Sequence, residues 1–173
     1  HEAREALELA LALAEKAQNL GDVNSVLYLL ASVEARLGRT APAMRRLERA
    51  IAMHEQLGND SGVPNTQWLL LGALQRDAGR YDDALRLLGR AVQTLRAGAT
   101  VDFAASAQMA LAQAYLDLGR PELARQAMPA PQDGWIPALH AMWQHRQGRI
   151  EQALGRPAVA HFEAGLQQLG GDV

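Results

Sequence analysis

A glycine followed by an arginine recurs four times in this sequence, each time in similar surroundings. The glycines are Gly38, Gly79, Gly119 and Gly155, and successive copies lie about 40 residues apart. A period of this size is typical of repeat arrays, in which each repeat packs only against its neighbours. In such an array, a function is expected on a shared surface and not in a catalytic pocket.

The segments between the glycines have the pattern of helices. A second series divides the chain further, into pieces of roughly 15 to 20 residues, and consists of Gly21, Gly58, Gly98, Gly134 and Gly170. Apolar residues recur at spacings of three and four, as in Val23, Val26, Leu27 and Leu30. Glycine can close a helix in the left-handed conformation, and Thr40 or Pro121 can begin the next one. The sequence therefore predicts an all-α fold of antiparallel helix pairs.

Composition limits the classes of function. The 173 residues are 49% hydrophobic and 5% aromatic, so one domain with a core of alanine and leucine is expected. The net charge of −2 does not favour nucleic acid, and the cluster of Arg45, Arg46 and Arg49 is interpreted as a solvated helix face. Cysteine is absent, which excludes disulfides and is compatible with a cytoplasmic location. No apolar run is long enough to span a bilayer, so no membrane partner is expected.

The motifs of catalytic and cofactor sites are missing from the sequence. Lys16 is the only lysine and does not follow a glycine-rich loop, so no phosphate-binding loop is present. His140 and His145 are five residues apart and point to different sides of a helix, which argues against a metal site. Asp82 and Asp83 are interpreted as acidic residues at a helix start. We therefore expect no enzyme activity, no cofactor and no metal.

Trp68 and the pair Leu71-Gly72, followed by Ala84 and by Leu88 one turn later, resemble the tetratricopeptide repeat. The resemblance implies a right-handed superhelical solenoid of about eight or nine helices, with small residues at the helix crossings and Trp68 in the core. The period near 40 resembles the long-repeat subtype of kinesin light chains, spindle-orientation adaptors and the sensor arms of bacterial signal-transduction ATPases related to the maltose regulator.

The repeats predict one domain over residues 1–173, expected to be part of a larger protein. Its divisions are the second helix of a truncated repeat (1–21), three repeats (22–60, 61–99 and 100–133, the last with a short second helix) and a divergent repeat (134–173). Met128-Pro129-Ala130-Pro131 predicts an irregular loop, because proline stops a helix. Trp135, which follows this loop, is a candidate for an exposed contact.

The sequence of the expected first helix contains two apolar stripes. Leu9, Leu13 and Leu20 form one, and Leu7, Leu11 and Ala14 form a second that no other segment obviously covers. An uncovered apolar stripe favours association. Self-association through the terminal helices is therefore expected.

In the tetratricopeptide-repeat family, the first helices of successive repeats line a concave groove that binds partners. The resemblance places in this groove Ser25, Tyr28, Ser32, Arg36, Thr66, Leu69, Ala73, Arg76, Asp77, Ser106, Met109, Gln113, Asp117 and His145. Family members that clamp a carboxylate tail use a lysine in these rows, and this chain has none there. A semi-apolar groove with a mixed-charge edge suits an extended peptide or a helix.

Two functions are compatible with these features. The first is a non-catalytic scaffold that binds a peptide or helix of a protein partner in the groove. The second is the ligand- or protein-sensing arm of a bacterial signal-transduction ATPase or transcriptional regulator.

Overall fold

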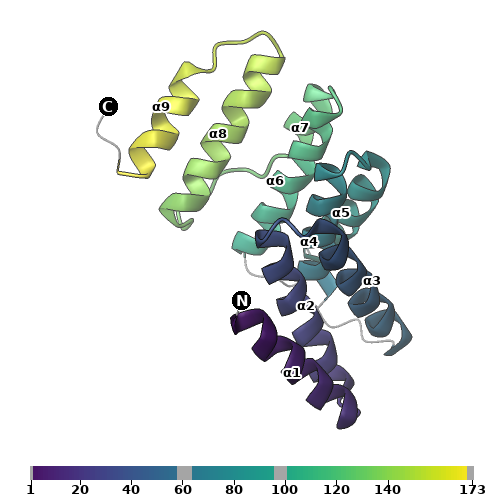
Figure 1. The fold of residues 1–173 in the computed structure, drawn as a ribbon. Helices are drawn as coiled ribbons and strands as arrows, with labels where there is room; N and C mark the ends of the chain where they lie inside the picture. The colour runs from purple at the N-terminus through teal and green to yellow at the C-terminus, as the bar shows by residue number, and fades with distance from the viewer. Residues whose placement is uncertain (1, 58–63, 96–100, 171–173) are drawn as a thin grey trace. The chain divides into compact units, whose positions relative to one another are not determined.

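The computed structural model describes residues 2–57, 64–95 and 101–170, and these ranges contain helices and no strand (Figure 1). The helices are α1 (Glu2–Lys16), α2 (Leu20–Arg36), α3 (Thr40–Leu57), α4 (Pro64–Asp77), α5 (Tyr81–Leu95), α6 (Val101–Asp117), α7 (Pro121–Ala127), α8 (Pro137–Ala153) and α9 (Val159–Gln168). None of these helices, in the part of the chain described, is long and apolar enough to cross a membrane.

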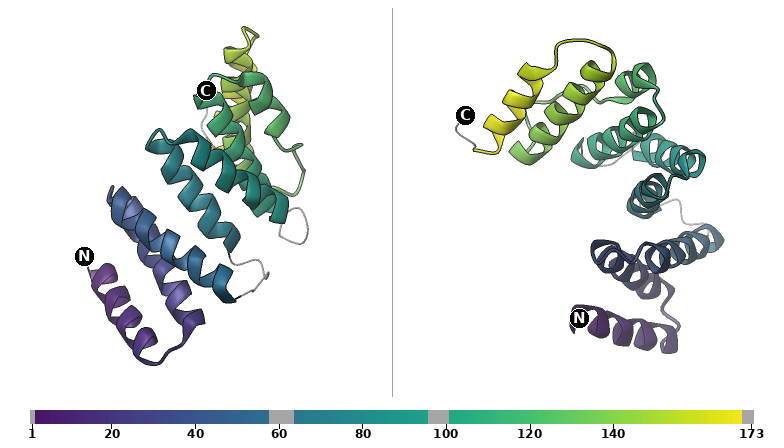
Figure 2. Two further views of the ribbon diagram at one scale, coloured as in Figure 1. Left: turned by 90° about the vertical axis from the view of Figure 1, so that its right-hand side faces the viewer. Right: turned by 45° about the horizontal axis from the view of Figure 1, so that its top comes forward.

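The chain forms two compact units, His1–Arg80 and Tyr81–Val173. In the first unit, α1 packs on α2, α2 on α3, and α3 on α4. In the second, α6 packs on α5 and α7, and α8 packs on α6, α7 and α9. Consecutive helices run antiparallel in both units (Figure 2). Each unit is therefore built from helix pairs, as the all-α prediction requires.

The four glycines of the Gly-Arg motif close helices as predicted. Gly38, Gly79, Gly119 and Gly155 have φ of 72°, 75°, 68° and 71°, in the left-handed region where a side chain is disfavoured. The backbone amide of the arginine after each glycine donates a hydrogen bond to the carbonyl oxygen five residues earlier. The N···O distances are 2.8 Å for Arg39 to Glu34 and 2.9 Å for Arg80 to Gln75, Arg120 to Tyr115 and Arg156 to Glu151. These bonds satisfy carbonyls that the helix end leaves free.

The turn between α1 and α2 differs from the prediction. Helix α2 begins at Leu20, so Gly21 lies inside its first turn and not at the end of the preceding helix. Gln18 takes the left-handed position instead, with φ of 53°. Asn19 caps α2 by accepting a hydrogen bond from the amide of Asp22 at 3.3 Å. A local cap at Asn19 therefore sets the start of α2, and Gly21 does not close the helix before it.

The apolar stripe of α1 that was expected to be uncovered is buried, and the other stripe is exposed. Leu11 and Ala14 are buried and Leu7 packs beside them, in a cluster with Val23, Val26, Leu27, Leu30, Ala50 and Met53. Leu9 and Leu13 are instead 64% and 59% exposed. The stripe that was expected to lack a cover is thus covered by α2 and α3. The other stripe faces outward.

The loop after α7 occurs where it was predicted, but its tryptophan is not exposed. Helix α7 ends at Ala127, and α8 begins only at Pro137. Trp135 is 5% exposed and packs with Ala105, Met109 and Leu139. The expectation of an exposed contact at Trp135 is therefore wrong, because the loop folds back on α6.

Small residues allow close helix approach in the second unit. Gly72 and Ala84, assigned to crossings from the sequence, are both buried. The closest approach described lies between α8 and α9, where a Cβ on Gly148 would be 2.7 Å from Cε1 of Phe162. A Cβ on Gly165 would be 3.4 Å from the carbonyl oxygen of Ala141. A Cβ at Gly148 would therefore force the ring of Phe162 to shift.

One buried polar contact links three helices of the first unit. Asn24 of α2 donates from Nδ2 to the carbonyl oxygen of Ala50 in α3 at 2.7 Å. Gln67 of α4 donates from Nε2 to Oδ1 of Asn24 at 2.5 Å. Asn24 and Gln67 are 6% and 1% exposed, so these hydrogen bonds lie within the apolar core.

We expect the Gly148→Ala variant to be less stable than the wild type by about 1 kcal/mol or more, because the added methyl displaces the Phe162 ring. Gly89→Ala in α5 is the matched control, since a Cβ there meets nothing within 4 Å. That change should stabilise by up to about 1 kcal/mol through helix propensity. Urea unfolding of both variants measures the difference, and equal midpoints would contradict the tight crossing.

Candidate partner-binding surface

Helices α2 and α4 carry the residues expected to bind a partner in the first unit. Most of them keep part of their surface exposed: Ser25, Arg36 and Asp77 are exposed, and Tyr28, Ser32, Thr66, Leu69, Ala73 and Arg76 are half-buried. Helices α2 and α4 are in direct contact. We call the half-buried set Tyr28, Ser32, Thr66, Leu69 and Ala73 the α2–α4 surface.

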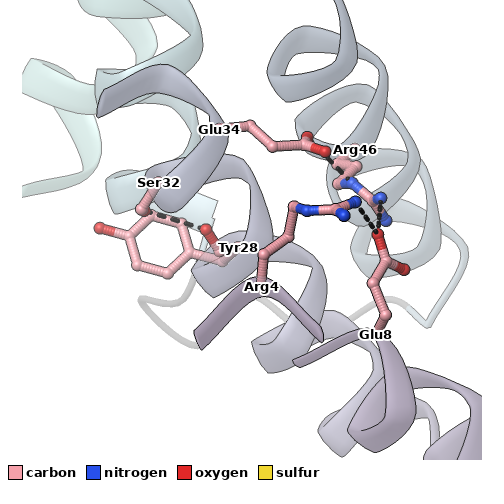
Figure 3. Close-up of polar contacts among 6 residues, drawn as sticks. All are labelled: Arg4, Glu8, Tyr28, Ser32, Glu34 and Arg46. Atoms are coloured by element: carbon pink, nitrogen blue, oxygen red, sulfur yellow. Dashed lines mark hydrogen bonds and ion pairs between the residues drawn. The ribbon is translucent and has the colours of Figure 1, made fainter. Parts of the chain in front are cut away.

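The serine hydroxyl groups of α2 bond within their own helix. Ser32 donates from Oγ to the carbonyl oxygen of Tyr28 at 2.9 Å, and the two residues lie side by side on α2 (Figure 3). Ser25 donates in the same way to Gly21 at 3.0 Å. Because the hydroxyl protons are used, each oxygen can still accept a hydrogen bond from a ligand.

The edge of the α2–α4 surface carries opposite charges. Arg76 contacts the same Oδ1 of Asp77 with Nη2 at 2.6 Å and with Nε at 3.0 Å. The Asp77 side chain is 59% exposed. Arg76 and Asp77 thus pair with each other at the end of α4, which leaves little net charge there.

A network of charged residues ties α1, α2 and α3 together (Figure 3). Arg46 contacts Glu34 through Nε at 3.0 Å and Glu8 through Nη2 at 2.5 Å, and Arg4 lies 4.0 Å from the same Glu8 oxygen. The Glu34 side chain is only 4% exposed and that of Arg46 is 22% exposed. The interpretation of Arg46 as part of a solvated face is therefore wrong.

Arg49, another member of that arginine cluster, contacts Glu15 at 2.6 Å and so adds a second link between α3 and α1. The arginine cluster thus holds α1 against its neighbours. Within the described ranges, no group of three or more histidine or acidic side chains is arranged to hold a metal ion.

In the second unit, only part of the expected row is accessible. Ser106 is half-buried and Asp117 and His145 are exposed. Gln113 is 8% exposed and donates to Oδ1 of Asp117 at 2.5 Å. Met109 is 1% exposed, which corrects its assignment to a groove.

The burial of Met109 has a clear cause. Trp135 and Leu139 pack on it, and Arg146 of α8 donates a hydrogen bond to its carbonyl oxygen. Trp143 of α8 also donates from Nε1 to the carbonyl oxygen of Pro129 at 2.9 Å. These contacts hold the loop and α8 against α6, so this stretch of α6 is part of the core.

A groove between α8 and α9 was not identified from the sequence. Its volume is about 480 Å³, and its lining residues are Ala138, Ala141, Met142, His145, Arg146, Phe162, Gly165, Leu166 and Leu169. Ala141 and Gly165 lie where α8 and α9 approach closely, and Ala138 lines the groove beside this contact. Of the expected site residues, His145 is the one that borders this groove.

Comparison with known families identifies one repeat directly. Residues 105–128 match the family model of the tetratricopeptide repeat, and this stretch contains most of α6 and all of α7. The chain has a tetratricopeptide-repeat fold. The match covers a helix pair that has the left-handed Gly119 between its helices.

Solved tetratricopeptide-repeat structures resemble the whole chain. The nearly identical TPR-like repeats of a candidate kinesin light chain from Podosopora anserina share 19% identity at a TM-score of 0.77, covering 98% of this chain and 86% of that one. BtubC (BKLC) from P. vanneervenii shares 19% identity at a TM-score of 0.75, covering 98% of this chain and 71% of that one. No curated protein matches the sequence.

These similarities confirm the long-period tetratricopeptide-repeat resemblance and the solenoid fold class. A tetratricopeptide-repeat fold is that of a protein–protein interaction scaffold, which is generally non-catalytic.

Replacing Arg46 by methionine is expected to destabilise the protein by about 3 kcal/mol, because the buried Glu34 carboxylate loses its partner. Arg86→Met is the matched control, since Arg86 and Asp83 form a pair whose side chains are 62% and 48% exposed. That change should lie within about 0.5 kcal/mol of the wild type. The free energy of unfolding in urea measures both, and equal losses would contradict the structural role of Arg46.

Proposed function

We propose that this chain is a non-catalytic interaction scaffold that binds a peptide or a helix of a protein partner on the α2–α4 surface. The observation that supports this proposal is the partial exposure of Tyr28 and Leu69 on adjacent helices. Their sequence neighbours Leu27 and Trp68 are buried, at 1% and 7% exposure. Tyr28 and Leu69 are therefore left for contacts outside the core.

The chemistry of the α2–α4 surface suits a ligand of mixed character. Tyr28 and Leu69 offer apolar area, and tyrosine is enriched among the residues that dominate binding energy. Ser32 and Thr66 add polar atoms beside them, and Ala73 leaves room for a bulky ligand side chain. An extended peptide or an amphipathic helix can combine apolar anchors with hydrogen bonds in this way.

The charges argue against a partner recognised through a terminal carboxylate. The only lysine of the sequence is Lys16, which lies on α1 and not on α2 or α4. Of the two arginines expected in this region, Arg76 contacts Asp77 and Arg36 lies exposed on α2. An internal segment of a partner therefore fits this surface better than a chain end.

The proposal also includes self-association through α1. Leu9 and Leu13 point outward on a helix whose opposite face is anchored by Leu7 and Leu11. Apolar stripes that remain exposed on an ordered helix favour association. This stripe replaces the one on which the sequence-based expectation rested.

The proposed binding to the α2–α4 surface is tested with peptides from a phage-displayed random library. These peptides are selected on the immobilised chain. We expect Tyr28→Ala combined with Leu69→Ala to weaken the selected peptides by about tenfold or more, because both anchors are lost. Leu123→Ala, which changes an exposed leucine of α7, is the control and should bind normally. Affinities come from fluorescence polarisation, and circular dichroism verifies the helix content.

Equal affinity in the double variant and the control would place binding outside the α2–α4 surface.

The regulatory alternative has a different readout. A melting temperature that rises with a small metabolite, and not with any selected peptide, would favour the ligand-sensing arm of a regulator.

A further inference from the structure

We infer that the α2–α4 surface binds a segment of its partner in the polyproline II conformation, with a bulky apolar residue at every third position. The inference rests on the proposed function and names the conformation that this surface receives. Three features of the surface carry it: the spacing of its apolar anchors, the extent of its apolar row along α2, and the hydrogen-bonding character of its flanks.

The two apolar anchors hold equivalent places on neighbouring helices. Tyr28 on α2 and Leu69 on α4 are separated by the same interval as Gly38 and Gly79. Both anchors are half-buried, α2 packs directly against α4, and the two helices run in the same direction because α3 between them is antiparallel to both. Helices in contact lie about 8–10 Å apart, so a chain that crosses both meets an anchor at about this interval.

This interval selects among the conformations of a bound segment. Side chains on one face of a β-strand recur at every second residue, about 6.6 Å apart. In polyproline II, three residues complete a turn of about 9.3 Å, so every third side chain points to the same side. In an α-helix, the nearest match is every seventh residue, about 10.5 Å apart. The anchors therefore fit polyproline II best, an α-helix less closely and a strand poorly.

Along the axis of α2, the apolar row is only one residue long. Ser25 and Ser32 lie about one turn before and after Tyr28, and the small Ala73 lies one turn after Leu69 on α4. The two serines are about 10 Å apart along the helix axis. An amphipathic helix is about 10–12 Å across and buries an apolar stripe of roughly 100°, so its apolar side chains would press on these serines. A slender chain fits this short row better than a helix.

The serine flanks act as hydrogen-bond acceptors. Ser32 donates its own proton to the carbonyl oxygen of Tyr28 at 2.9 Å (Figure 3), and Ser25 donates to that of Gly21 at 3.0 Å. Both oxygens can then accept from a ligand. Beyond its first turn, an α-helix uses its backbone N–H groups internally. Polyproline II has no internal hydrogen bonds, so the N–H groups of its non-proline residues can donate to these oxygens.

The chemistry of the surface favours an uncharged segment that contains proline. Proline fixes φ near the polyproline II value, so prolines between the anchors order the segment before it binds and less entropy is lost. Proline-rich segments dock on aromatic side chains, as Tyr28 is here, and a phenol hydroxyl can donate to a carbonyl of the segment. Arg76 and Asp77 pair with each other at the end of α4, which leaves little net charge there to attract a charged segment.

The test uses the library peptides that bind the wild type and lose affinity for the variant with both Tyr28→Ala and Leu69→Ala. Each peptide is synthesised with a fluorescent label, and an alanine scan measured by fluorescence polarisation identifies its anchor residues. We expect two anchors three positions apart. The loss caused by truncating one anchor should vanish on Tyr28→Ala and that of the other on Leu69→Ala, because each anchor contacts one row.

Proline substitution in the same peptides separates an extended chain from a helix. Each of the two residues between the anchors is replaced by proline in turn. At least one of these peptides should bind the wild type as tightly as its parent or more tightly, because proline preorganises polyproline II. A helical ligand would lose about 100-fold or more with every such change, because proline removes a helical hydrogen bond and clashes with the preceding turn.

A variant of the chain tests the acceptor role of the flank. Ser32→Ala should weaken the peptides by about threefold or more, because one acceptor is lost. The peptide N–H whose methylation weakens binding to the wild type should be insensitive to methylation on Ser32→Ala. Thr94→Ala on α5 is the matched control, since the Thr94 hydroxyl also donates within its helix, to the carbonyl oxygen of Arg90 at 2.8 Å. Circular dichroism verifies that both variants keep their helix content.

The possible failures are distinguishable. If no selected peptide depends on Tyr28 and Leu69, the proposed function and this inference are both overturned. Anchors seven positions apart, with every intervening proline abolishing binding, would show a helix as the ligand and overturn the inference while the proposed function stands. Anchors two or four positions apart would show a strand, with the same consequence. Equal affinity of Ser32→Ala and Thr94→Ala would overturn the role of the serine flank as an acceptor.

Discussion

The left-handed glycine turn is the constraint on which the helix pairs depend. At Gly38, Gly79, Gly119 and Gly155 the chain ends one helix, satisfies its last carbonyls and begins another within a few residues. A residue with a Cβ is strained in this conformation, so the four positions are fixed by backbone geometry and not by contacts. Within each unit, where the connection is short, each helix lies antiparallel to the next and buries its apolar face there.

Features governed by local rules could be predicted from the sequence. The glycine turns and the end of α7 before Pro129 follow from backbone conformation. The burial of Trp68 is what the tetratricopeptide-repeat resemblance implied. The fold class followed from the same features, because a regular interval between turns leaves few alternatives to stacked helix pairs. The boundaries of the repeats and the residues that bind a partner stay predictions.

Features governed by distant segments could not be predicted in this way. Helical spacing marks both stripes of α1 as apolar but does not say which of them α2 covers. Met109 lies at a position that is half-buried in α4, where Leu69 is its equivalent, yet the loop carrying Trp135 folds over it. Arg46 is half-buried because it pairs with the buried Glu34, twelve residues earlier. Each outcome depends on a contact between elements that no local pattern encodes.

The hydrogen bonds of Asn24 favour one arrangement of helices in the first unit. A core of alanine and leucine would allow helices of similar repeats to exchange places during folding at little cost, and misassembly of this kind is characteristic of repeat proteins. Gln67 on α4 completes the contact with Asn24, whereas α6 has Ala107 at the corresponding position and Ala105 where α4 has Asn65. If α2 paired with α6, the Asn24 amide would lie buried without this partner, at a cost of about 1–3 kcal/mol. A single amide thus specifies the order in which otherwise interchangeable helices assemble.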